Sequence, residues 1–442
     1  MKIRFWTSTQ YSGFMEGLIR ELNSNGMDAQ QCYHITEASY RSAKTAPARL
    51  WLRFRQYIAY PLQLILTLTW QRVRNGNDGS LQVVSTNTFY APLLATYLQA
   101  NTIHLVYDLF PEAMIHSGKW QEGSFKVKVI RWITRQSLQR ARCNVFLGQR
   151  LKDYVESIHG SVSNSAIIEV GADQALFPQS PEQRDKQNER RTANVQHSTS
   201  NPESQPAKER CDSHSPNLPF SHSQSDPPSN LSTFNLQLER SDSPTLLYCG
   251  NFGNMHDSQT LFDYWRTHAK EGTNDSCVLP IFKFHCSGPK RAALEQVHAQ
   301  LPATLQARIQ LGDGLNQSKW ITAMERADVA LVTMCPGSET VVMPSKTYSA
   351  MMAGQAILAI APEDSDLVDL IQTADCGWWI SPGDNKSLAS IIEQISSDPI
   401  MLLQKRSNAY HYAQQHLGQN ALIQKWEKLG AELNLVSQHA AL

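Results

Sequence analysis

The sequence of 442 residues lacks several features that would each assign it to a well-defined class of protein. Its eight cysteines include no CxxC pair and no zinc-ligand spacing, so neither a redox motif nor a zinc site is predicted. No apolar run reaches the roughly 20 residues of a membrane-spanning helix. The first residues, MKIRFWTST, are too short and polar for a signal peptide, and we therefore expect a cytoplasmic protein with reduced thiols.

The formal net charge is zero, but positive charge is concentrated in the first half of the chain. Residues 41–74 carry seven basic side chains and no acidic one, and residues 119–152 carry nine basic side chains and one acidic one. Segment 48–74 mixes arginines, aromatics and aliphatics, a pattern that favours peripheral attachment to an anionic membrane surface. The alternative is a buried helix with a solvated basic rim. No nucleic-acid-binding motif accompanies the charge, so no nucleic acid partner is expected.

The order of hydrophobic segments predicts an α/β protein. Residues 1–178 and 244–410 each alternate short strand-like runs with amphipathic helical segments, which indicates two parallel sheets covered by helices. Two such domains facing a central crevice are the simplest architecture, and residues 411–442 are expected to form a helical tail. Residues 179–243 differ, because they are rich in Ser, Pro, Gln and Asn and poor in aliphatics. We expect that stretch to be a disordered insertion, since it cannot bury enough apolar surface to offset its ordering entropy.

The most informative segment is 335–355, CPGSETVVMPSKTYSAMMAGQ. It follows a predicted buried strand and places Glu339 seven residues before Lys346, which Ser345 precedes. A strand-to-helix turn at the carboxyl end of a parallel strand is where α/β proteins bind ligands. The free N–H groups and the dipole of a helix N-terminus, together with a lysine, suit a phosphate.

A second candidate is the glycine-containing loop after the predicted strand TLLYCGN. Gly250, Asn251 and Gly253 would expose backbone N–H groups to a diphosphate, although a two-glycine loop is also compatible with a simple turn. Gly13, after the first predicted strand, would let a backbone approach a ligand or serve as a turn glycine.

In the first half, VYDLFPEAMIHSG places Asp108 and Glu112 directly after a buried strand. A carboxylate at that position is predicted to face the crevice. The alternative for Asp108 is an N-cap, since Asp before a turn commonly accepts from a helix N-terminus.

These segments resemble family 4 glycosyltransferases of the GT-B fold, in particular bacterial O-antigen and capsule enzymes similar to L-fucosamine transferase. The matching pieces occur in the family's order and are VYDLFPE (106–112), IIEVGADQALFP (167–178), LLYCGNFGNMHDSQTL (246–261), FKFHCSGP (282–289), ERADVALVTMCPGSETVVMPSKTYSAMMAG (325–354) and DCGWWISPGD (375–384). The block around PSK is the specific part of the resemblance.

The resemblance implies transfer of a sugar, with retention, from a nucleotide-diphospho-sugar to a lipid-linked or glycan acceptor in polysaccharide or lipopolysaccharide assembly. It implies that Glu339 holds donor hydroxyls and that Lys346 and the Gly250–Gly253 amides neutralise the diphosphate. Asp108 would lie near the acceptor or the reacting sugar. It implies no metal or other cofactor. The enzyme would work at the inner face of a membrane.

Two departures from the family keep alternatives open. Ser349 stands where a second glutamate is usual, and Asn254-Met255-His256 replaces the basic residue that follows the glycine loop. A catalytically inactive GT-B protein that binds a nucleotide sugar or a partner enzyme is therefore one alternative. A sugar-nucleotide epimerase of the same fold is another, with Asp108, Glu112 and His116 as acid and base groups.

Overall fold

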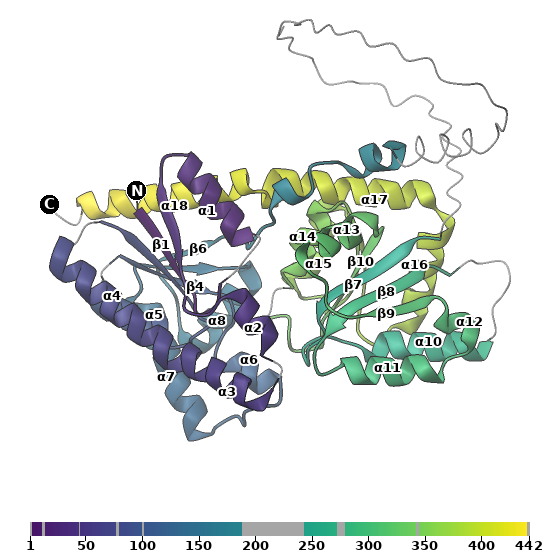
Figure 1. The fold of residues 1–442 in the computed structure, drawn as a ribbon, viewed down its shortest axis with the longest axis horizontal. Helices are drawn as coiled ribbons and strands as arrows, with labels where there is room; N and C mark the ends of the chain where they lie inside the picture. Colours follow the sequence, from purple (N-terminus) through teal and green to yellow (C-terminus); the bar gives the residue numbers. More distant parts are fainter. Residues whose placement is uncertain are drawn as a thin grey trace, which may run out of the picture. The chain divides into compact units, whose positions relative to one another are not determined.

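The computed structural model describes residues 2–10, 14–43, 45–76, 79–99, 101–187, 243–271, 279–341 and 344–439. The described residues of 1–181 and 243–442 form one compact unit, which is separate from residues 182–187. This compact unit contains two parallel six-stranded sheets (Figure 1). Most of the predicted disordered stretch, residues 188–242, lies outside the described residues, but residues 181–187 are helical and the prediction of disorder was wrong there.

The first sheet has the strand order β2–β1–β3–β4–β5–β6. Its strands are β1 (Lys2–Trp6), β2 (Asp28–Cys32), β3 (Leu81–Ser85), β4 (Thr102–Val106), β5 (Cys143–Phe146) and β6 (Ser165–Ile167). Strands β3, β4 and β5 are buried along their whole length, as expected for parallel strands with helices on both faces. The direction of winding reverses between β1 and β3, which makes their carboxyl ends a topological switch point.

Helices cover both faces of this sheet. They are α1 (Phe14–Ser24), α2 (Glu37–Ser42), α3 (Ala46–Phe54), the π-helical η1 (Arg55–Ala59), α4 (Tyr60–Asn75), α5 (Ala91–Leu98), α6 (Glu112–His116), α7 (Phe125–Arg140), α8 (Gln149–His159) and the 3₁₀ turn η2 (Gln174–Leu176). Side chains alternate along β1, so that Phe5 packs with Leu18 of α1 whereas Trp6 packs with Leu64 of α4. Helices α4, α5 and α7 pack side by side in that order (Figure 1).

The second sheet has the order β12–β11–β10–β7–β8–β9, and all its pairs are parallel. Its strands are β7 (Thr245–Asn251), β8 (Ile281–Ser287), β9 (Ile309–Gly312), β10 (Val329–Thr333), β11 (Ala356–Ile360) and β12 (Gly377–Ile380). Its helices are α10 (Gln259–Glu271), α11 (Arg291–Gln300), α12 (Ala303–Gln306), α13 (Gln317–Arg326), α14 (Lys346–Met352), α15 (Asp366–Ala374) and α16 (Asn385–Ser397). Here the switch point lies between the adjacent strands β7 and β10.

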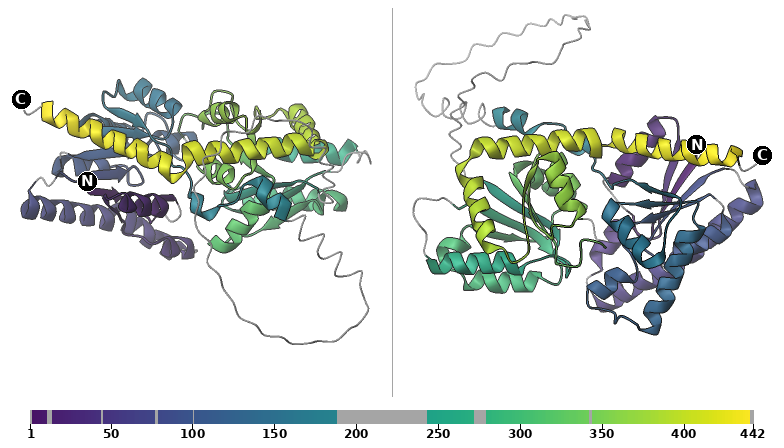
Figure 2. Two further views of the ribbon diagram at one scale, coloured as in Figure 1. Left: turned by 90° about the horizontal axis from the view of Figure 1, so that it is seen from above. Right: turned by 180° about the vertical axis from the view of Figure 1, so that it is seen from behind.

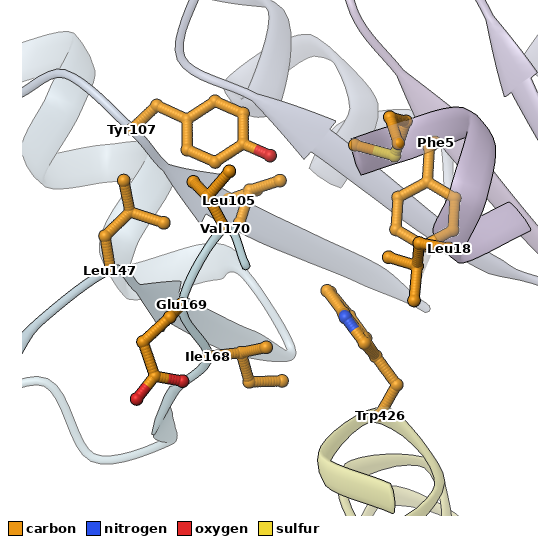
Figure 3. Close-up of a pocket in the computed structure, with 10 residues that line it drawn as sticks. Phe5, Leu18, Leu105, Tyr107, Leu147, Ile168, Glu169, Val170 and Trp426 are labelled. Atoms are coloured by element: carbon orange, nitrogen blue, oxygen red, sulfur yellow. The ribbon is translucent and has the colours of Figure 1, made fainter. Parts of the chain in front are cut away.

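The C-terminal segment links the two sheets. It comprises α17 (Pro399–Tyr412), the π-helical η3 (Ala413–Leu417) and α18 (Gln419–His439). Helix α18 runs along the first sheet, on the side that α1 also covers (Figure 2). Trp426 of α18 points toward Phe5 and Leu18 beside a void of about 10 Å³, and its ring meets that of Phe5 edge-on at 5.4 Å (Figure 3). The void has room for about one water molecule and no sugar.

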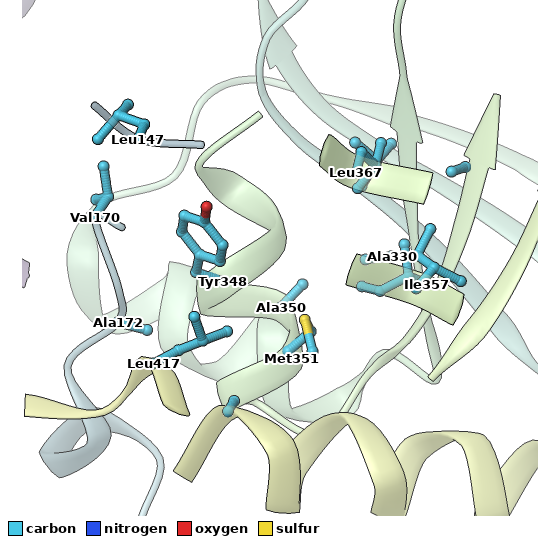
Figure 4. Packing of buried hydrophobic residues seen from close by; sticks show 14 of the residues in the cluster. Leu147, Val170, Ala172, Ala330, Tyr348, Ala350, Met351, Ile357, Leu367 and Leu417 are labelled. Atoms are coloured by element: carbon cyan, nitrogen blue, oxygen red, sulfur yellow. The ribbon is translucent and has the colours of Figure 1, made fainter. Parts of the chain in front are cut away.

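One hydrophobic cluster contains residues from both halves of the chain (Figure 4). Tyr348 of α14 lies at its centre, between Leu147 and Val170 from the first half and Leu417 from η3. The segment that carries Lys346 therefore continues into a helix in which most residues are buried. Its position is fixed by packing rather than by solvent-exposed loops.

The structure confirms the predicted fold class of two Rossmann-like sheets, but one predicted helix end was wrong. Gly377 was expected to cap the helix over 365–377, whereas Asp375 takes the left-handed conformation at φ 46° and closes α15. Gly377 instead opens β12, where a Cβ atom would overlap the carbonyl oxygen of Ile357 on β11. Glycine is needed there for close strand approach. In the part of the chain that the structure describes, no helix combines the length and apolarity needed to cross a membrane.

Candidate functional site

The candidate site lies at the carboxyl ends of β7 and β10. The chain leaves β7 toward α10 and β10 toward α14, so the two following loops border the switch point of the second sheet. The structure thus confirms that the 335–355 segment is a strand-to-helix turn, with Lys346 as the first residue of α14. Ser345 occupies the N-cap position of α14 in helical backbone geometry, without a side-chain capping bond.

Lys346 is held by an aromatic residue of the neighbouring strand. Its Nζ donates to the Tyr248 hydroxyl at 2.9 Å and lies 4.0 Å from the centre of that ring. Burial lowers the pKa of Lys346 to about 7, and the nearby thiols of Cys249 and Cys286 oppose that shift. Because few negative charges lie near Lys346, a bound anion would stabilise its protonated form and raise its pKa.

Tyr248 connects this lysine to the glycine loop. Its side chain is buried, burial raises its pKa, and its hydroxyl donates to the carbonyl oxygen of Asn251 at 2.9 Å while accepting from Lys346. The ring packs against Phe252 and Phe284 at centroid distances of 4.8 and 5.8 Å. The phenol therefore remains neutral and orients both the lysine and the end of β7.

The loop after β7 lies close to the loop after β8. Gly250 has φ 131° and Gly288 has φ 111°, and a Cβ atom on Gly288 would overlap the Asn251 side chain. The Phe252 N–H donates to the Ser287 carbonyl at 2.6 Å. Only glycine fits Gly288, and the close approach brings the predicted donor-binding residues Gly250, Asn251 and Gly253 beside the end of β8.

A second cation, Lys290, lies beside the same loops. Its Nζ donates to the carbonyl oxygen of His256 and lies 3.7 Å from the Cys335 sulfur. His256 Nδ1 bonds the Thr333 carbonyl at 2.8 Å, and burial, reinforced by the charges of Lys346 and Lys290, lowers its pKa to about 3. His256 is therefore neutral. Lys290, in the segment after β8, supplies a positive charge beside the glycine loop, where Asn254-Met255-His256 supplies none.

Glu339 lies in the loop between β10 and α14. One of its carboxylate oxygens, Oε2, is buried and has no hydrogen-bond partner among the described residues. The neighbouring Ser338 hydroxyl donates to the Cys335 carbonyl at 2.6 Å, which fixes the loop. A buried, unpartnered carboxylate oxygen is costly, and hydroxyl donors of a ligand would satisfy it.

Side chains of the first half lie next to this loop. A Cβ atom on Gly337 would lie 3.4 Å from His116 Nδ1, and His116 Nε2 lies 3.2 Å from the Tyr154 hydroxyl. Burial raises the pKa of Tyr154, and the charges of nearby carboxylates, Glu339 among them, add to the shift. His116 and Tyr154 therefore lie near the loop that carries Glu339.

Asp108 follows β4 at the carboxyl edge of the first sheet. Its backbone N–H donates to the Thr86 hydroxyl at 3.2 Å, and the residue is exposed, although partial desolvation of its carboxyl raises the pKa of that group. The N-cap alternative for Asp108 is wrong, because α6 begins at Glu112 and Pro111 occupies its cap position. No contact between Asp108 and the residues around Lys346 is seen within the described chain. Gly13 lies outside the described residues.

A larger cavity, of about 350 Å³, lies on the second sheet near its β7 and β8 strands and α13. Its walls include Lys283, Lys319 and Arg326, but not Lys346, Lys290 or Glu339. The larger cavity therefore does not coincide with the place where Lys346, Lys290 and Glu339 lie. We assign the site by the half-buried cation Lys346 and the unpartnered carboxylate oxygen of Glu339, since both groups would be stabilised by a ligand.

Comparisons with known proteins bear on this architecture through solved structures rather than through a family profile. No protein-family profile matches the sequence. A probable glycosyltransferase, WbjE of Pseudomonas aeruginosa, is 37% identical over 68 residues, which span 15% of this chain and only 17% of that protein. Anabaena HepE, solved with UDP and glucose, superposes with a TM-score of 0.61 at 12% identity, covering 98% of this chain and 100% of HepE.

Two further solved structures share the fold over nearly the whole of both chains. Sucrose-phosphate synthase of Thermosynechococcus elongatus has a TM-score of 0.61 at 13% identity, covering 100% of this chain and 99% of the other. A trehalose-phosphate synthase of Burkholderia vietnamiensis has a TM-score of 0.58 at 11% identity, with the same coverage. The chain therefore has the GT-B glycosyltransferase fold.

Three of the residues described above were not predicted from the sequence. Tyr248 is an apolar-strand residue whose hydroxyl has a role only through Lys346, and Lys290 directly follows the SGP segment that ended the predicted motif. The sequence analysis treated His256 only as part of the segment that replaces a basic residue, and it did not predict that His256 anchors the loop through the Thr333 carbonyl. A lysine directly after a glycine-containing strand end was the signal that could have identified Lys290.

Proposed function

We propose that the chain is a GT-B glycosyltransferase that moves a sugar, with retention, from a nucleotide-diphospho-sugar to a lipid-linked or glycan acceptor. The observation that carries the proposal is Lys346, a poorly compensated lysine at the first residue of α14, beside the switch point of β7 and β10. A diphosphate at that position would meet the lysine and the N-terminus of a helix. The solved complexes of HepE with UDP and with UDP-glucose support a uridine nucleotide as the first donor to test.

The chemistry requires a leaving group to be stabilised. The bond between the anomeric carbon and the diphosphate oxygen breaks, a bond to an acceptor hydroxyl oxygen forms, and the acceptor's proton passes to a base such as a diphosphate oxygen. Cations aimed at the departing diphosphate lower the barrier, because negative charge develops there in the transition state. We assign this role to Lys346 and Lys290, with backbone N–H groups of Gly250–Gly253 and the hydroxyl of Ser345 as further donors.

Glu339 and Asp108 receive different proposed roles. The unpartnered Oε2 of Glu339 would accept from donor-sugar hydroxyls, beside His116 and Tyr154. Asp108, at the edge of the first sheet, would face the acceptor. In this proposal residues 244–410 bind the donor and residues 1–178 bind the acceptor during polysaccharide assembly at the cytoplasmic face of a membrane. Metal independence also remains a prediction.

The epimerase alternative is less well supported by the contacts. Glu112, one of its three candidate groups, is buried and accepts from Arg131 Nε at 2.7 Å. The ion pair holds one carboxylate oxygen in place, while Oε2 has no partner among the described residues, and no contact joins Glu112 to Lys346 or Glu339 in the bonds that position the proposed donor site. The inactive alternative is supported by Ser349 at the second glutamate's position, and turnover decides between it and transfer.

The first test is a thermal-shift measurement of the full chain with UDP, GDP, ADP and their sugar conjugates. A nucleotide at a hundredfold excess over its dissociation constant should stabilise the native state by about 3 kcal/mol. Lys346→Ala should abolish that shift, whereas Lys386→Ala, at an exposed lysine of α16, should retain it. An equal shift in both variants would remove Lys346 from the donor site, and binding without any sugar transfer would favour the inactive protein.

A further inference from the structure

Several helices of the first half carry large apolar side chains on their solvent-exposed sides. Eleven of them lie on α3, η1, α4 and α7, and each is at least 37% exposed: Leu50, Trp51, Phe54, Ile58, Leu62, Leu66, Trp70, Val73, Phe125, Val129 and Trp132. We call this set the outer apolar face. Isolated exposed apolar residues are ordinary, but a contiguous group of this size marks an interaction surface.

Helix α3 has no buried residue at all, although its sequence is APARLWLRF. Leu50 is 70% exposed and Trp51 is 59% exposed, and Trp51 stacks on Phe54 with ring centres 5.2 Å apart. Helix α3 continues without a break through η1 into α4, which anchors it to the first sheet. Its outer apolar side chains are therefore held in a helix without being covered by any part of the described chain.

Helix α4 is apolar on two opposite sides. Tyr60, Leu64 and Leu68 are buried against the first sheet and α5, which confirms part of the buried-helix alternative for segment 48–74. The other side presents Leu66 and Trp70, which are 69% and 63% exposed. Packing against the first sheet explains only the inner apolar side of α4, so the outer apolar side has no partner within the described chain.

Helix α7 extends the face beyond segment 48–74. Its inner side chains are buried, and its outer side presents Phe125, Val129 and Trp132, with Phe125 83% exposed. Helix α5 lies between α4 and α7 in one layer, so the outer residues of all three helices belong to one surface (Figure 1). The basic run in residues 119–152, for which no separate role was predicted, includes this helix.

The charges indicate what covers the face. The helical segments 46–75 and 125–140 contain ten basic residues and no acidic one: Arg49, Arg53, Arg55, Arg72, Arg74, Lys126, Lys128, Arg131, Arg135 and Arg140. Some are engaged within the protein, as Arg131 is with Glu112 and Glu122, but Arg49, Arg53 and Lys128 are exposed. Apolar and aromatic side chains interleaved with exposed cations match the interface of an anionic bilayer.

We propose that the outer apolar face docks on an anionic lipid bilayer, with α3, η1, α4 and α7 lying in the plane of the membrane surface. A second copy of the chain fits less well, because a two-fold contact through this face would oppose cations to cations. A nucleic acid offers phosphates but no apolar layer for the leucines and Val73. The inference deepens the proposed function in that a lipid-linked acceptor would be presented at this surface.

The test measures partition of the full chain onto phosphatidylcholine vesicles with and without phosphatidylglycerol. Binding should require the anionic lipid and weaken at high salt. The double variant L66S/W70S on α4 and the single variant W132S on α7 should each lower the partition coefficient about tenfold or more. Ile400→Ser on α17 is the matched control, because Ile400 is 69% exposed but lies outside the face.

A charge variant separates lipid attraction from apolar contact. Arg53→Glu should reduce binding to the anionic vesicles, whereas Lys386→Glu should not. Equal partition of wild type and the α4 variant would overturn the docking face, and an unaffected α7 variant would overturn its two-helix form. Binding to an acidic protein or to heparin but not to vesicles would also overturn it.

Nucleotide-induced thermal shifts of the same variants distinguish this inference from the proposed function. A chain that binds UDP but no vesicles would contradict the docking face alone. A chain that binds vesicles but no nucleotide would contradict the donor site alone. Circular dichroism of each variant verifies that the serine substitutions, all at exposed positions, leave the fold intact.

Discussion

The two sheets share one plan but differ in what surrounds them. Each has six parallel strands and a switch point next to its first strand. Of the fourteen large hydrophobic side chains that are exposed among the described residues, thirteen belong to residues 40–132 and one, Ile400, to the second half. The second half instead holds Lys346 and Lys290 at its switch point. Because the framework is shared, we expect the outward helix faces and the loops after the strands to account for the different roles proposed for the two halves.

The largest expected effect separates the two halves by role. Lys346→Ala should remove both nucleotide binding and transfer, with a loss of activity of about a hundredfold or more, because a cation at the leaving group acts in the transition state. Asp108→Asn should reduce transfer while leaving the nucleotide dissociation constant unchanged. Isothermal titration and a radiolabelled transfer assay measure the two quantities. If Asp108→Asn also abolished nucleotide binding, the proposal that the second half binds the donor and the first half binds the acceptor would be wrong.

The next effect concerns the framework of the second sheet. Gly377→Ala should destabilise the protein by about 3 kcal/mol, since the added methyl group would overlap the Ile357 backbone between β11 and β12. Gly314→Ala, where a Cβ atom would meet nothing within 4 Å, is the matched control. Urea unfolding of both variants measures the difference. Equal stabilities would mean that β12 can move away at little cost.

Lys346 should also cost the free protein stability. Its pKa falls from 10.5 to about 7 on folding, so the unfolded chain holds more protons, and stability rises with pH between about 7 and 10.5. Below that window the cost of burying the charged lysine is fully present. Lys346→Met should therefore stabilise the ligand-free protein near pH 6, on the order of 2 kcal/mol, as calorimetry would measure. A destabilised variant would show that the Tyr248 contact outweighs the burial of the charge.

A smaller pH effect belongs to the first sheet. Burial lowers the pKa of His104 to about 4, and its hydrogen bond with Asn144 only partly opposes that shift. His104 binds a proton near pH 6.5 in the unfolded chain but only near pH 4 in the folded chain. The free energy of unfolding therefore decreases as pH falls from about 6.5 to 4. His104→Gln should reduce the loss of stability between pH 8 and about pH 5.5 by about 1 kcal/mol. An unchanged pH profile would assign the acid sensitivity to other groups, such as His159.

The sequence was sufficient to predict most of the strands and the position of the central motif, but the short polar strand β2 was missed. Thr245–Asn251 was predicted residue for residue, and the 335–355 segment lies between β10 and β11 as expected. Continuous apolar runs identify buried parallel strands because both of their faces are covered. The cap at Gly377 was wrong because a glycine after a helix has several uses, and only the neighbouring strand shows which one applies.

The candidate site was only partly predictable. Lys346 and Glu339 were proposed from their position after a buried strand, whereas Tyr248 and Lys290 became candidates because β7 lies next to both β10 and β8 in the sheet. Strand order is set by packing between segments far apart in the chain, and local patterns do not encode it. The membrane expectation for 48–74 likewise stayed ambiguous, since a helix that is apolar on two sides has the same composition as a buried one.

By itself, the sequence determined the alternation of strands and helices, the concentration of basic residues in the first half, and a lysine at the start of a helix after a buried strand. These properties depend on near neighbours in the chain, where periodicity and propensity act. Only the tertiary structure decided that Tyr248 holds Lys346, that Lys290 joins them, and that α7 extends the apolar face of α3 and α4. Those contacts join residues far apart in the sequence, and long-range packing alone brings them together.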